Sequence, residues 1–417
     1  MAQLQLVGIS FQSLPVALRE DFALTNERKE DAPVLLKEIF GLSEIVCLYT
    51  CNRIEYYYTS ENDVDPLALF CYFCQNPMEL NQKIASNIYF YQGDQVSDHL
   101  FKVVSGLKSM VIGETQILNQ VKKAYQISSR NGCLHKDLNS LFQFAFKTAK
   151  EIHRHTNLDV IKRSISSLSI ELAESLLGSL KDLKVLIVGT GETAELTKKC
   201  LMAKGYENFL FMSKTEERAK DWSERNGTPT LLTRDLPFVL DEFDVVVACT
   251  DCQEPILRKD MIFGNLNKSK VLIDLGVPRN IDSSIGELQN IYLRNIDDLK
   301  GIVDKNHESR MREVVYAEEI ISEAVAKFKS RQSLNELFQS IHENCMDEAS
   351  LNLRKAIFHF QNNGSLDTLE EEIAAIIVKS IEAPLDRFRS FANKIPATVL
   401  NDYAFDEKVY TSKNLCS

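Results

Sequence analysis

The sequence predicts a multidomain α/β protein: an N-terminal α+β domain, a doubly wound parallel α/β domain, and an all-helical C-terminal part. Three observations predict it. The chain has 417 residues, which is too long for one hydrophobic core. Apolar runs of strand length alternate with helical patterns through the first two thirds of the chain. From about Leu288 no proline appears until Pro384, and only Gly301 and Gly364 interrupt the helical pattern.

The composition is that of a soluble globular protein, with 44% hydrophobic and 26% charged residues. No stretch approaches the roughly 20 apolar residues of a membrane span, and Met1–Gln5 lacks the basic region of a signal peptide. We therefore expect a cytoplasmic protein, no membrane contact, and reduced thiols for the ten scattered cysteines. The net charge of −11 argues against non-specific duplex binding but leaves room for a local RNA-binding patch.

Two Cys-x-x-Cys pairs raise the question of a metal. Cys71 and Cys74 lie in an apolar segment, and Cys249 and Cys252 follow a buried-looking strand. A zinc site needs four ligands close together in space. Because the pairs are far apart in sequence and fall in different predicted domains, we expect no metal.

The N-terminal part alternates strands with helices, which indicates a compact α+β domain. Asn26 is the expected N-cap of the second helix. The expected strands are Leu4–Ser10, Ile45–Leu48 and Tyr56–Tyr58, and the expected helices are a short one from Pro15 that carries Arg19 and Glu20, then Ala32–Phe40, then Pro66–Cys74.

Between the second and third strands lies Tyr49-Thr50-Cys51-Asn52-Arg53-Ile54-Glu55, a polar cluster at a strand–turn junction. A cysteine there is a candidate nucleophile. A nearby Arg53 would lower the pKa of the thiol, since the thiolate is the reactive form. Arg53 would alternatively grip a substrate carboxylate through two hydrogen bonds. The competing interpretation is a small core cysteine beside an arginine that forms a surface ion pair.

From Val96 the pattern becomes helical and runs to Lys122, interrupted by Gly106 and Gly113. Each glycine within a helix costs about 1 kcal/mol relative to alanine, so we interpret both as places where backbone approaches a ligand. His99 is a candidate general acid or base, although a lone histidine is more often structural.

A nucleotide-binding motif follows the strand Lys184–Val188. The sequence reads Gly189-Thr190-Gly191-Glu192-Thr193-Ala194 and continues as a helix through Leu201. The first glycine makes the tight turn, the second admits a pyrophosphate, and the helix N-terminus faces the phosphates. This strand–glycine–helix context predicts a Rossmann domain.

The next strand, Phe209–Met212, ends in Ser213-Lys214-Thr215, with Arg218 one turn beyond. An NAD site usually has Asp or Glu here. Because hydroxyls and cations stand there instead, we expect NADPH as the cofactor. Strands at Val245–Cys249 and Val271–Leu275 complete the predicted parallel sheet.

In the C-terminal part, Val314, Ala317, Ile321, Ala324 and Phe328 form a narrow apolar seam on a long helix. We interpret this helical region as a dimerisation unit, with an intramolecular bundle as the alternative. Asn362–Gly364 reads as a turn, and 397–417 as a frayed tail. The predicted domains are 1–156 (catalytic), 157–296 (NADPH-binding) and 297–417 (spinal helix and dimerisation domain).

The order of these parts resembles the glutamyl-tRNA reductase family. The resemblance is carried by Thr50-Cys51-Asn52-Arg53-x-Glu55, by the stretch Gly106–Lys122, by Val277-Pro278-Arg279-Asn280-Ile281-Asp282 and by Asn295-Ile296-Asp297-Asp298-Leu299. It runs from near Leu6 to about Phe328.

The resemblance implies reduction of glutamyl-tRNA(Glu) by NADPH to glutamate-1-semialdehyde, the first step of tetrapyrrole synthesis by the five-carbon route. It implies that Cys51 forms a thioester and expels the tRNA. It assigns Arg53 to the side-chain carboxylate of the substrate and makes His99 a catalytic-site histidine. It implies a V-shaped homodimer, and hand-over of the product to glutamate-1-semialdehyde aminomutase is a further expectation. The other implied substrate-binding residues are Thr50, Asn52, Ser109, Glu114, Gln116 and Gln120.

The chain departs from the family pattern at Phe11–Pro15, Thr115, Asn119, Ile152–Thr156, Lys214 and Val378–Pro384. Two other functions therefore stay open. One is a catalytically impaired relative that binds glutamyl-tRNA or a pathway partner. The other is an NADP dehydrogenase for a free metabolite, which leaves the Gly106–Lys122 match unexplained.

Overall fold

The computed structural model describes residues 3–74, 85–156, 158, 164–262, 268–299 and 307–363, and the single positions 373, 375 and 376. The chain divides into two compact units, residues 1–321 and 322–417. Both β-sheets belong to the first unit. The sequence motif Val378–Pro384, the tail 397–417 and Gly364 of the predicted turn lie outside the described residues.

The first sheet is antiparallel, with the order β2-β3-β1-β4. Its strands are β1 (Gln3–Ser10), β2 (Glu44–Tyr49), β3 (Arg53–Ser60) and β4 (Tyr89–Gln92). Strands β2 and β3 form the predicted hairpin, whose turn, Thr50–Asn52, carries Cys51. Strand β3 lies between β2 and β1, and all its residues are buried. Side chains that leave this hairpin are therefore held by a rigid, buried strand.

Short helices connect these strands: α1 (Val16–Arg19), the 3₁₀ turn η1 (Glu20–Phe22), α2 (Asn26–Phe40) and α3 (Pro66–Cys71). The expectation that Asn26 caps α2 was wrong. Thr25 is the cap, because its side chain accepts a hydrogen bond from the Arg28 backbone N–H. Asp65 caps α3 in a similar way, through the Leu67 N–H.

The predicted continuous helix from Val96 to Lys122 is two helices, α5 (Asp94–Val104) and α6 (Gln116–Arg130). Gly106 and Gly113 have φ angles of 74° and 83°, which end a right-handed helix. A Cβ on Gly113 would lie 2.4 Å from the Leu158 carbonyl oxygen. The segment 105–115 is thus a tight, packed turn between α5 and α6. Helix α7 (Lys136–His155) follows α6.

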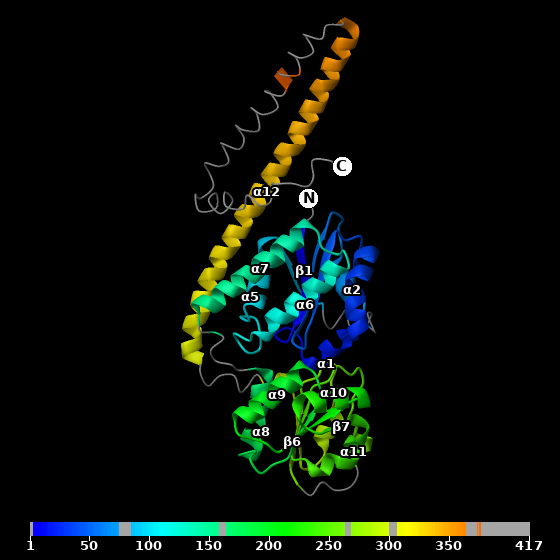
Figure 1. The fold of residues 1–417 in the computed structure, drawn as a ribbon, viewed down its shortest axis with the longest axis vertical. Coiled ribbons are helices and arrows are strands. Elements are labelled where there is room, and N and C mark those ends of the chain that lie inside the picture. Colours follow the sequence, from blue (N-terminus) through cyan, green and yellow to red (C-terminus); the bar gives the residue numbers. More distant parts are fainter. Residues whose placement is uncertain are drawn as a thin grey trace. The chain divides into compact units, whose positions relative to one another are not determined.

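The second sheet is entirely parallel, with the order β10-β9-β8-β5-β6-β7. If the six strands are numbered by their order in the chain, the sheet reads 3-2-1-4-5-6 from β7 to β10. This is the Rossmann arrangement, as predicted (Figure 1). Its strands are β5 (Val185–Val188), β6 (Phe209–Ser213), β7 (Thr230–Leu232), β8 (Val245–Ala248), β9 (Lys270–Asp274) and β10 (Ile291–Asn295).

Its α-helices are α8 (Ile165–Leu177), α9 (Glu192–Ala203), α10 (Glu216–Asn226) and α11 (Leu236–Val239), and its 3₁₀ turns are η2 (Thr233–Asp235), η3 (Leu240–Glu242), η4 (Lys259–Met261) and η5 (Ser283–Glu287). Two apolar clusters cover the two faces of the sheet. One of them also contains Phe11, Val16, Met110 and Val111 from the N-terminal part, and Cys51 packs against it. The thiol therefore lies where the two sheet domains meet.

The C-terminal helix is α12 (His307–Asn363). The prediction that the chain is helical from Leu288 was wrong at its start. Residues Ile291–Asn295 pair with β9 as the edge strand β10. In the apolar seam, Ala317, Ile321, Ala324 and Phe328 are buried within the single chain. Dimerisation through the C-terminal helices stays a prediction, as do the domain bounds 1–156, 157–296 and 297–417.

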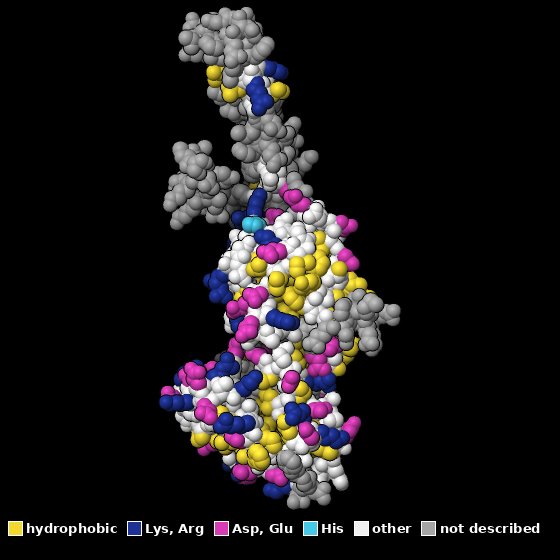
Figure 2. Space-filling view, turned by 90° about the vertical axis from the view of Figure 1, so that its right-hand side faces the viewer, with side chains coloured by type: hydrophobic (Ala, Val, Ile, Leu, Met, Phe, Trp, Pro, Cys, Tyr) yellow, Lys and Arg dark blue, Asp and Glu magenta, His cyan; other side chains and the backbone are white. Residues whose placement is uncertain are grey.

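The described helices include none long and apolar enough to cross a membrane. The face in Figure 2, on which α2 lies, mixes cationic and anionic side chains and shows hydrophobic side chains over the first sheet domain. Leu35 and Ile39 of α2 are among the exposed apolar residues.

Candidate active site

The turn that carries Cys51 is held by its own backbone and by Thr50. The Thr50 Oγ1 accepts hydrogen bonds from the backbone N–H groups of Asn52 (3.2 Å) and Arg53 (3.0 Å). The Thr50 N–H donates to the Arg53 carbonyl at 2.9 Å. Cys51 is half-buried at the tip, while the flanking strands are rigid. Thr50 thus fixes the backbone of the turn on the C-terminal side of Cys51.

Burial raises the pKa of the Cys51 thiol to about 12, and the carboxylate of Glu114 adds to this rise. The cations Arg19 and Lys29 partly oppose it. The expectation that Arg53 lowers this pKa was therefore wrong. Arg53 and Glu55 are two residues apart on β3 and share a face of the strand, so the guanidinium meets Glu55.

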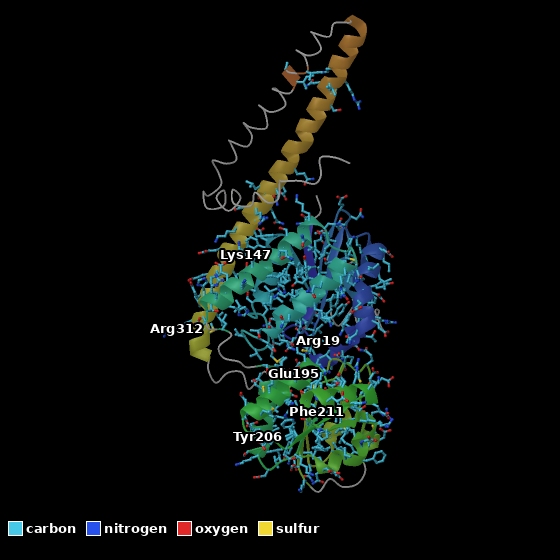
Figure 3. The ribbon with its side chains drawn as sticks, viewed as in Figure 1. Arg19, Lys147, Glu195, Tyr206, Phe211 and Arg312 are labelled. Atoms are coloured by element: carbon cyan, nitrogen blue, oxygen red, sulfur yellow. The ribbon has the colours of Figure 1, made fainter. Side chains whose placement is uncertain are left out.

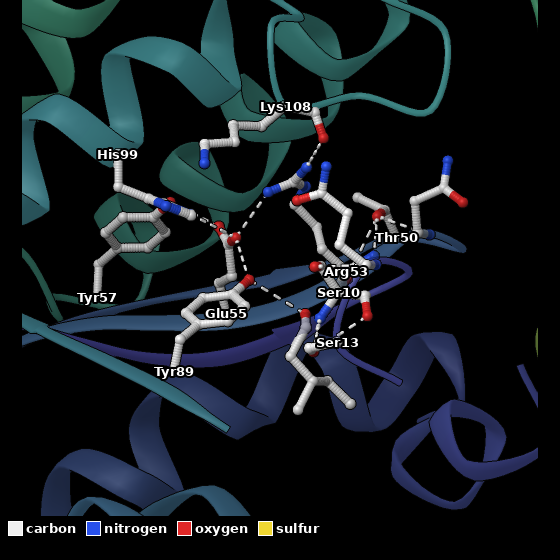
Figure 4. A network of polar contacts seen from close by, with 12 residues as sticks. Ser10, Ser13, Thr50, Arg53, Glu55, Tyr57, Tyr89, His99 and Lys108 are labelled. Carbon is white, nitrogen blue, oxygen red and sulfur yellow. Dashed lines mark hydrogen bonds and ion pairs between the residues drawn. The ribbon is translucent and has the colours of Figure 1, made fainter. Parts of the chain in front are cut away.

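Glu55 is the centre of a buried polar network, drawn in Figure 4. Its Oε1 lies 2.8 Å from Arg53 Nη1 and 2.8 Å from His99 Nε2, and accepts a 2.7 Å bond from the Tyr89 hydroxyl. Its Oε2 accepts from the Tyr57 hydroxyl at 2.6 Å. The other end of the Arg53 guanidinium donates to the carbonyl oxygen of Lys108.

This network sets the charge state of Glu55. Burial alone would raise the pKa of the carboxyl, but Arg53 and His99 lower it far below its ordinary value. The same carboxylate raises the pKa of Arg53 against the opposing effect of burial. A paired, ionised Glu55 therefore orients both Arg53 and His99. Sequence reasoning quoted Glu55 but gave it no role, and the i, i+2 spacing on a strand was the signal that identified its partner.

His99 comes from α5 and lies between two aromatic rings. The ring centroids of Tyr89 and Tyr91 are 5.3 and 5.1 Å from the imidazole. His99 is buried and its Nε2 is engaged by Glu55. Its predicted catalytic role, like the predicted carboxylate-binding role of Arg53, stays a prediction.

The remaining predicted substrate-binding residues lie on the 105–115 turn and on α6. Ser109 and Glu114 are buried in that turn, and Gln116 and Gln120, one helical turn apart on α6, are half-buried. Burial raises the pKa of Glu114 to about 7, against a backbone hydrogen bond from Ile165 that lowers it. The turn therefore brings a carboxyl group into electrostatic contact with Cys51.

The glycine motif lies at the carboxyl end of β5. Gly189 has φ of 134°, and a Cβ there would lie 2.7 Å from the Cys249 carbonyl oxygen, so only glycine fits. Gly191 has open space around the position of a Cβ and directly precedes α9. The small side chain of Ala194 is fully buried. This arrangement fits a nucleotide pyrophosphate at the N-terminus of α9, beside Thr190, Glu192 and Thr193.

The end of β6 fits the ribose side of such a nucleotide. Ser213 is buried, and its Oγ has no hydrogen-bond partner in the described structure, so it is available to a ligand. Thr215 caps α10 through the Arg218 N–H at 3.3 Å. Lys214 and Arg218 present exposed cations, and Glu216 reaches Arg234 at 2.9 Å.

Two ion pairs, which sequence reasoning did not predict, join the sheet domains. Arg19 lies 3.2 Å from Asp297, whose other oxygen accepts the Val16 N–H at 2.7 Å. Glu20 pairs with the guanidinium of Arg279 and also accepts its backbone N–H at 3.1 Å. Figure 3 shows Arg19 where the N-terminal part meets the Rossmann part. These contacts fix Cys51 relative to the parallel sheet.

The two Cys-x-x-Cys pairs lie apart. Cys71 and Cys74 belong to the core of the first domain, and Cys249 packs beside the second sheet. Among the described residues, no group of three or more His, Cys, Asp or Glu is arranged to hold a metal.

Comparison with known proteins identifies the family. Residues 7–156 match the model "Glutamyl-tRNAGlu reductase, N-terminal domain", and residues 171–302 match "Shikimate / quinate 5-dehydrogenase". A glutamyl-tRNA reductase from Solibacter usitatus is 34% identical over 408 residues, which cover 94% of this chain and 96% of the relative. This chain belongs to the glutamyl-tRNA reductase family.

Other glutamyl-tRNA reductases agree with this assignment. The one from Syntrophobacter fumaroxidans is 31% identical over 97% of this chain and 90% of its own length. The solved structure from Methanopyrus kandleri superposes with a TM-score of 0.50 at 26% identity, covering 97% of this chain and 100% of the other. The predicted family, mixed α/β fold and oxidoreductase class are confirmed. The dehydrogenase-type second domain supports a pyridine nucleotide as cofactor.

Proposed function

We propose that this chain reduces glutamyl-tRNA(Glu) with NADPH to glutamate-1-semialdehyde, through a thioester on Cys51, as the first step of tetrapyrrole synthesis. One observation carries the proposal. Cys51 belongs to the first domain but packs against the apolar cluster of the parallel sheet. An acyl group on its sulfur is then held beside the nucleotide-binding edge, so acyl transfer and reduction share one site.

The chemistry follows from the placed groups. The sulfur of Cys51 attacks the ester carbonyl carbon, the carbon–oxygen bond to the terminal ribose breaks, and the tRNA leaves. When bound, NADPH supplies the hydride that converts the thioester to the aldehyde. Thr50 holds the backbone of the turn that carries the sulfur, and Glu55 orients Arg53 and His99. Splitting the reaction into two steps replaces an oxygen ester with a more readily reduced thioester.

NADPH rather than NADH is proposed from the end of β6. The residues that would hold the nucleotide are Gly189–Ala194 around the pyrophosphate and Ser213, Lys214, Thr215 and Arg218 around the ribose. The unpartnered Ser213 Oγ and the two exposed cations suit a 2′-phosphate. No acid precedes Glu216 in this loop, and Glu216 is engaged by Arg234. A preference for NADPH over NADH in the same assay tests this assignment.

The exposed faces of α6 and α7 supply a surface for the tRNA. Residues 116–155 carry seven Lys and Arg against two Asp and Glu, while the whole chain has a net charge of −11. Aromatic rings lie among these cations, and Lys122 stands 6.0 Å from the ring centroid of Phe146. The exposed basic residues are Lys122, Lys123, Arg130, Lys136, Lys147, Lys150 and Arg154. Cations interleaved with aromatics suit an RNA backbone.

The tRNA surface has its own test. Replacing Lys122 and Lys150 with glutamate should weaken tRNA binding and flatten its dependence on salt, because fewer counterions are released. The paired variant Lys220→Glu and Lys199→Glu, on α10 and α9, is the matched control. If the two double variants weakened tRNA binding equally, α6 and α7 would not be the docking surface.

Three further expectations belong to the same proposal. A homodimer formed through C-terminal helices, transfer of the aldehyde to glutamate-1-semialdehyde aminomutase, and a cytoplasmic location all follow from the family resemblance. Size measurement in solution and co-purification with the aminomutase test the first two.

The experiment that tests the function follows NADPH absorbance with charged glutamyl-tRNA, for the wild type and for Cys51→Ser. Oxidation by the wild type alone, abolished by ribonuclease, is the expected result. Binding of tRNA without oxidation by either protein would instead favour a catalytically impaired relative. Oxidation that survives ribonuclease would favour a dehydrogenase for a free metabolite.

A further inference from the structure

Glu114 is a buried carboxyl group with a free oxygen. Its side chain is 8% exposed, and its Oε1 has no hydrogen-bond partner in the described structure. Its carboxylate accepts a hydrogen bond from the Ile165 backbone N–H at the start of α8. An unsatisfied buried oxygen is costly unless it serves a ligand or a reaction. Glu114 therefore requires an explanation beyond packing.

The turn that carries Glu114 is fixed by its backbone. The Gly113 N–H donates to the Gly106 carbonyl at 3.2 Å, and the Glu114 N–H donates to the Val111 carbonyl at 3.1 Å. A Cβ on Gly106 would lie 3.0 Å from both the N and the O of Glu114. The carboxyl is thus held from the N-terminal side by this turn and from the Rossmann side by α8.

Charged groups from α1, α2 and α9 act on Cys51 or on Glu114. Cys51 interacts electrostatically with Glu114, with Arg19 of α1 and with Lys29 of α2. Glu192, at the start of α9, also acts on Glu114. Among the groups that act on Cys51, the Glu114 carboxylate is the anion able to accept a proton.

We propose that Glu114 carries the proton of the acyl-transfer step, taking it from the Cys51 sulfur and giving it to the departing ribose oxygen. This rests on the proposed function and assigns Glu114 a catalytic role in addition to substrate contact. His99 is less suited to the task, because its Nε2 is engaged by Glu55 at 2.8 Å within a separate buried network.

The step balances without any further reactant. The S–H electron pair attacks the ester carbonyl carbon as the Glu114 carboxylate takes the proton. The S–C bond forms and the tetrahedral centre collapses. The C–O bond to the ribose then breaks, and the proton on Glu114 passes to that oxygen. Burial supports this role: it keeps the thiol protonated at neutral pH and raises the pKa of Glu114 to about 7, so that both forms of the carboxyl are populated.

The test compares Glu114→Gln with wild type in a single turnover, measuring release of tRNA and formation of the Cys51 thioester by mass spectrometry. The expected result is a 10²- to 10⁴-fold slower acyl transfer, the usual contribution of general acid–base catalysis. The wild-type rate should rise with pH through about 7 and then level off, and this rise should vanish in the variant. Glu114→Asp should restore part of the rate, and Glu38→Gln, on the exposed face of α2, is the matched control.

Alkylation of Cys51 by iodoacetamide supplies a second readout, independent of turnover. Removing the Glu114 charge should lower the thiol pKa, so alkylation of the variant at pH 8 should be several-fold faster than that of wild type. Slower acyl transfer together with faster alkylation supports the proposal. Acyl transfer by Glu114→Gln within threefold of wild type would overturn the proposal. So would a rise of rate with pH that persists in Glu114→Gln but is lost in Lys29→Met. Absence of a thioester in the wild type would count against the proposed function itself.

Discussion

Replacing Glu55 with glutamine removes the carboxylate on which Arg53, His99, Tyr57 and Tyr89 converge. Arg53 is 2% exposed and Glu55 is fully buried, so the guanidinium would stay in the interior without a counter-charge. Breaking a buried pair by removing one partner costs about 3–5 kcal/mol. Because glutamine keeps one oxygen as an acceptor, we expect a loss of about 3 kcal/mol from the stability of the first domain.

The chain offers a way to measure this loss domain by domain. Its single tryptophan, Trp222, lies buried in α10 of the Rossmann domain, so its fluorescence reports that domain alone. The first domain is reported by near-ultraviolet circular dichroism of its tyrosines, Tyr56, Tyr57 and Tyr58 among them. In urea, the tyrosine transition of Glu55→Gln should move to lower denaturant while the Trp222 transition changes less.

The control variant is Glu224→Gln. Glu224 pairs with Lys220 at 4.0 Å, with both side chains more than two-thirds exposed. Surface pairs of this kind contribute about 0–1 kcal/mol. The two shifts to compare are that of the tyrosine transition in Glu55→Gln and that of the Trp222 transition in Glu224→Gln. If the first were no larger than the second, the Glu55 carboxylate would not be what compensates the charge of Arg53, and the reasoning would fail.

Two further predictions concern backbone fit and pH. Gly189→Ala should lower the free energy of unfolding by at least about 2 kcal/mol, because its Cβ would meet the Cys249 carbonyl oxygen at 2.7 Å. Gly191→Ala, which has open space at the Cβ position, should leave the Trp222 transition nearly unchanged yet weaken nucleotide binding at least tenfold. Equal stability losses in the two variants would refute this. Glu114 has a folded pKa raised to about 7. Its contribution to stability is present below the unfolded value of about 4.3 and is lost as the pH rises through 7. Glu114→Gln should therefore be the more stable protein at pH 8, by up to about 3 kcal/mol, and identical pH profiles of unfolding would contradict the assignment.

Much of the fold was predictable because its signals are local. Apolar runs identified most strands of the two sheets, and Gly189–Ala194 marked the Rossmann turn through the conformations and close approaches that glycine allows. The strand β10 was missed, because it is an edge strand with mixed polarity in a stretch without proline. The break between α5 and α6 was also missed: Gly106 and Gly113 have positive φ, and Gly113 lies against Leu158, which is far from it in sequence.

The site was predicted less completely, because its electrostatics depend on distant residues. The sequence placed Cys51 and Arg53 together, but the strand geometry turns Arg53 toward Glu55. The cations that act on Cys51 are Arg19 and Lys29, which come from other helices. The interdomain pairs of Arg19 and Glu20 depend on partners more than 250 residues away, a separation that no local pattern reveals.

Those two ion pairs have a consequence for engineering. Both start from adjacent residues of one short segment, Val16–Phe22, and end on Arg279 and Asp297, two positions that lie far from this segment in sequence. A chimaera that joins the first domain of one relative to the dehydrogenase domain of another must therefore inherit these four side chains as a set. Fusing the domains at the 156–164 connection alone would yield two folded halves with the thiol misaligned from its reductant.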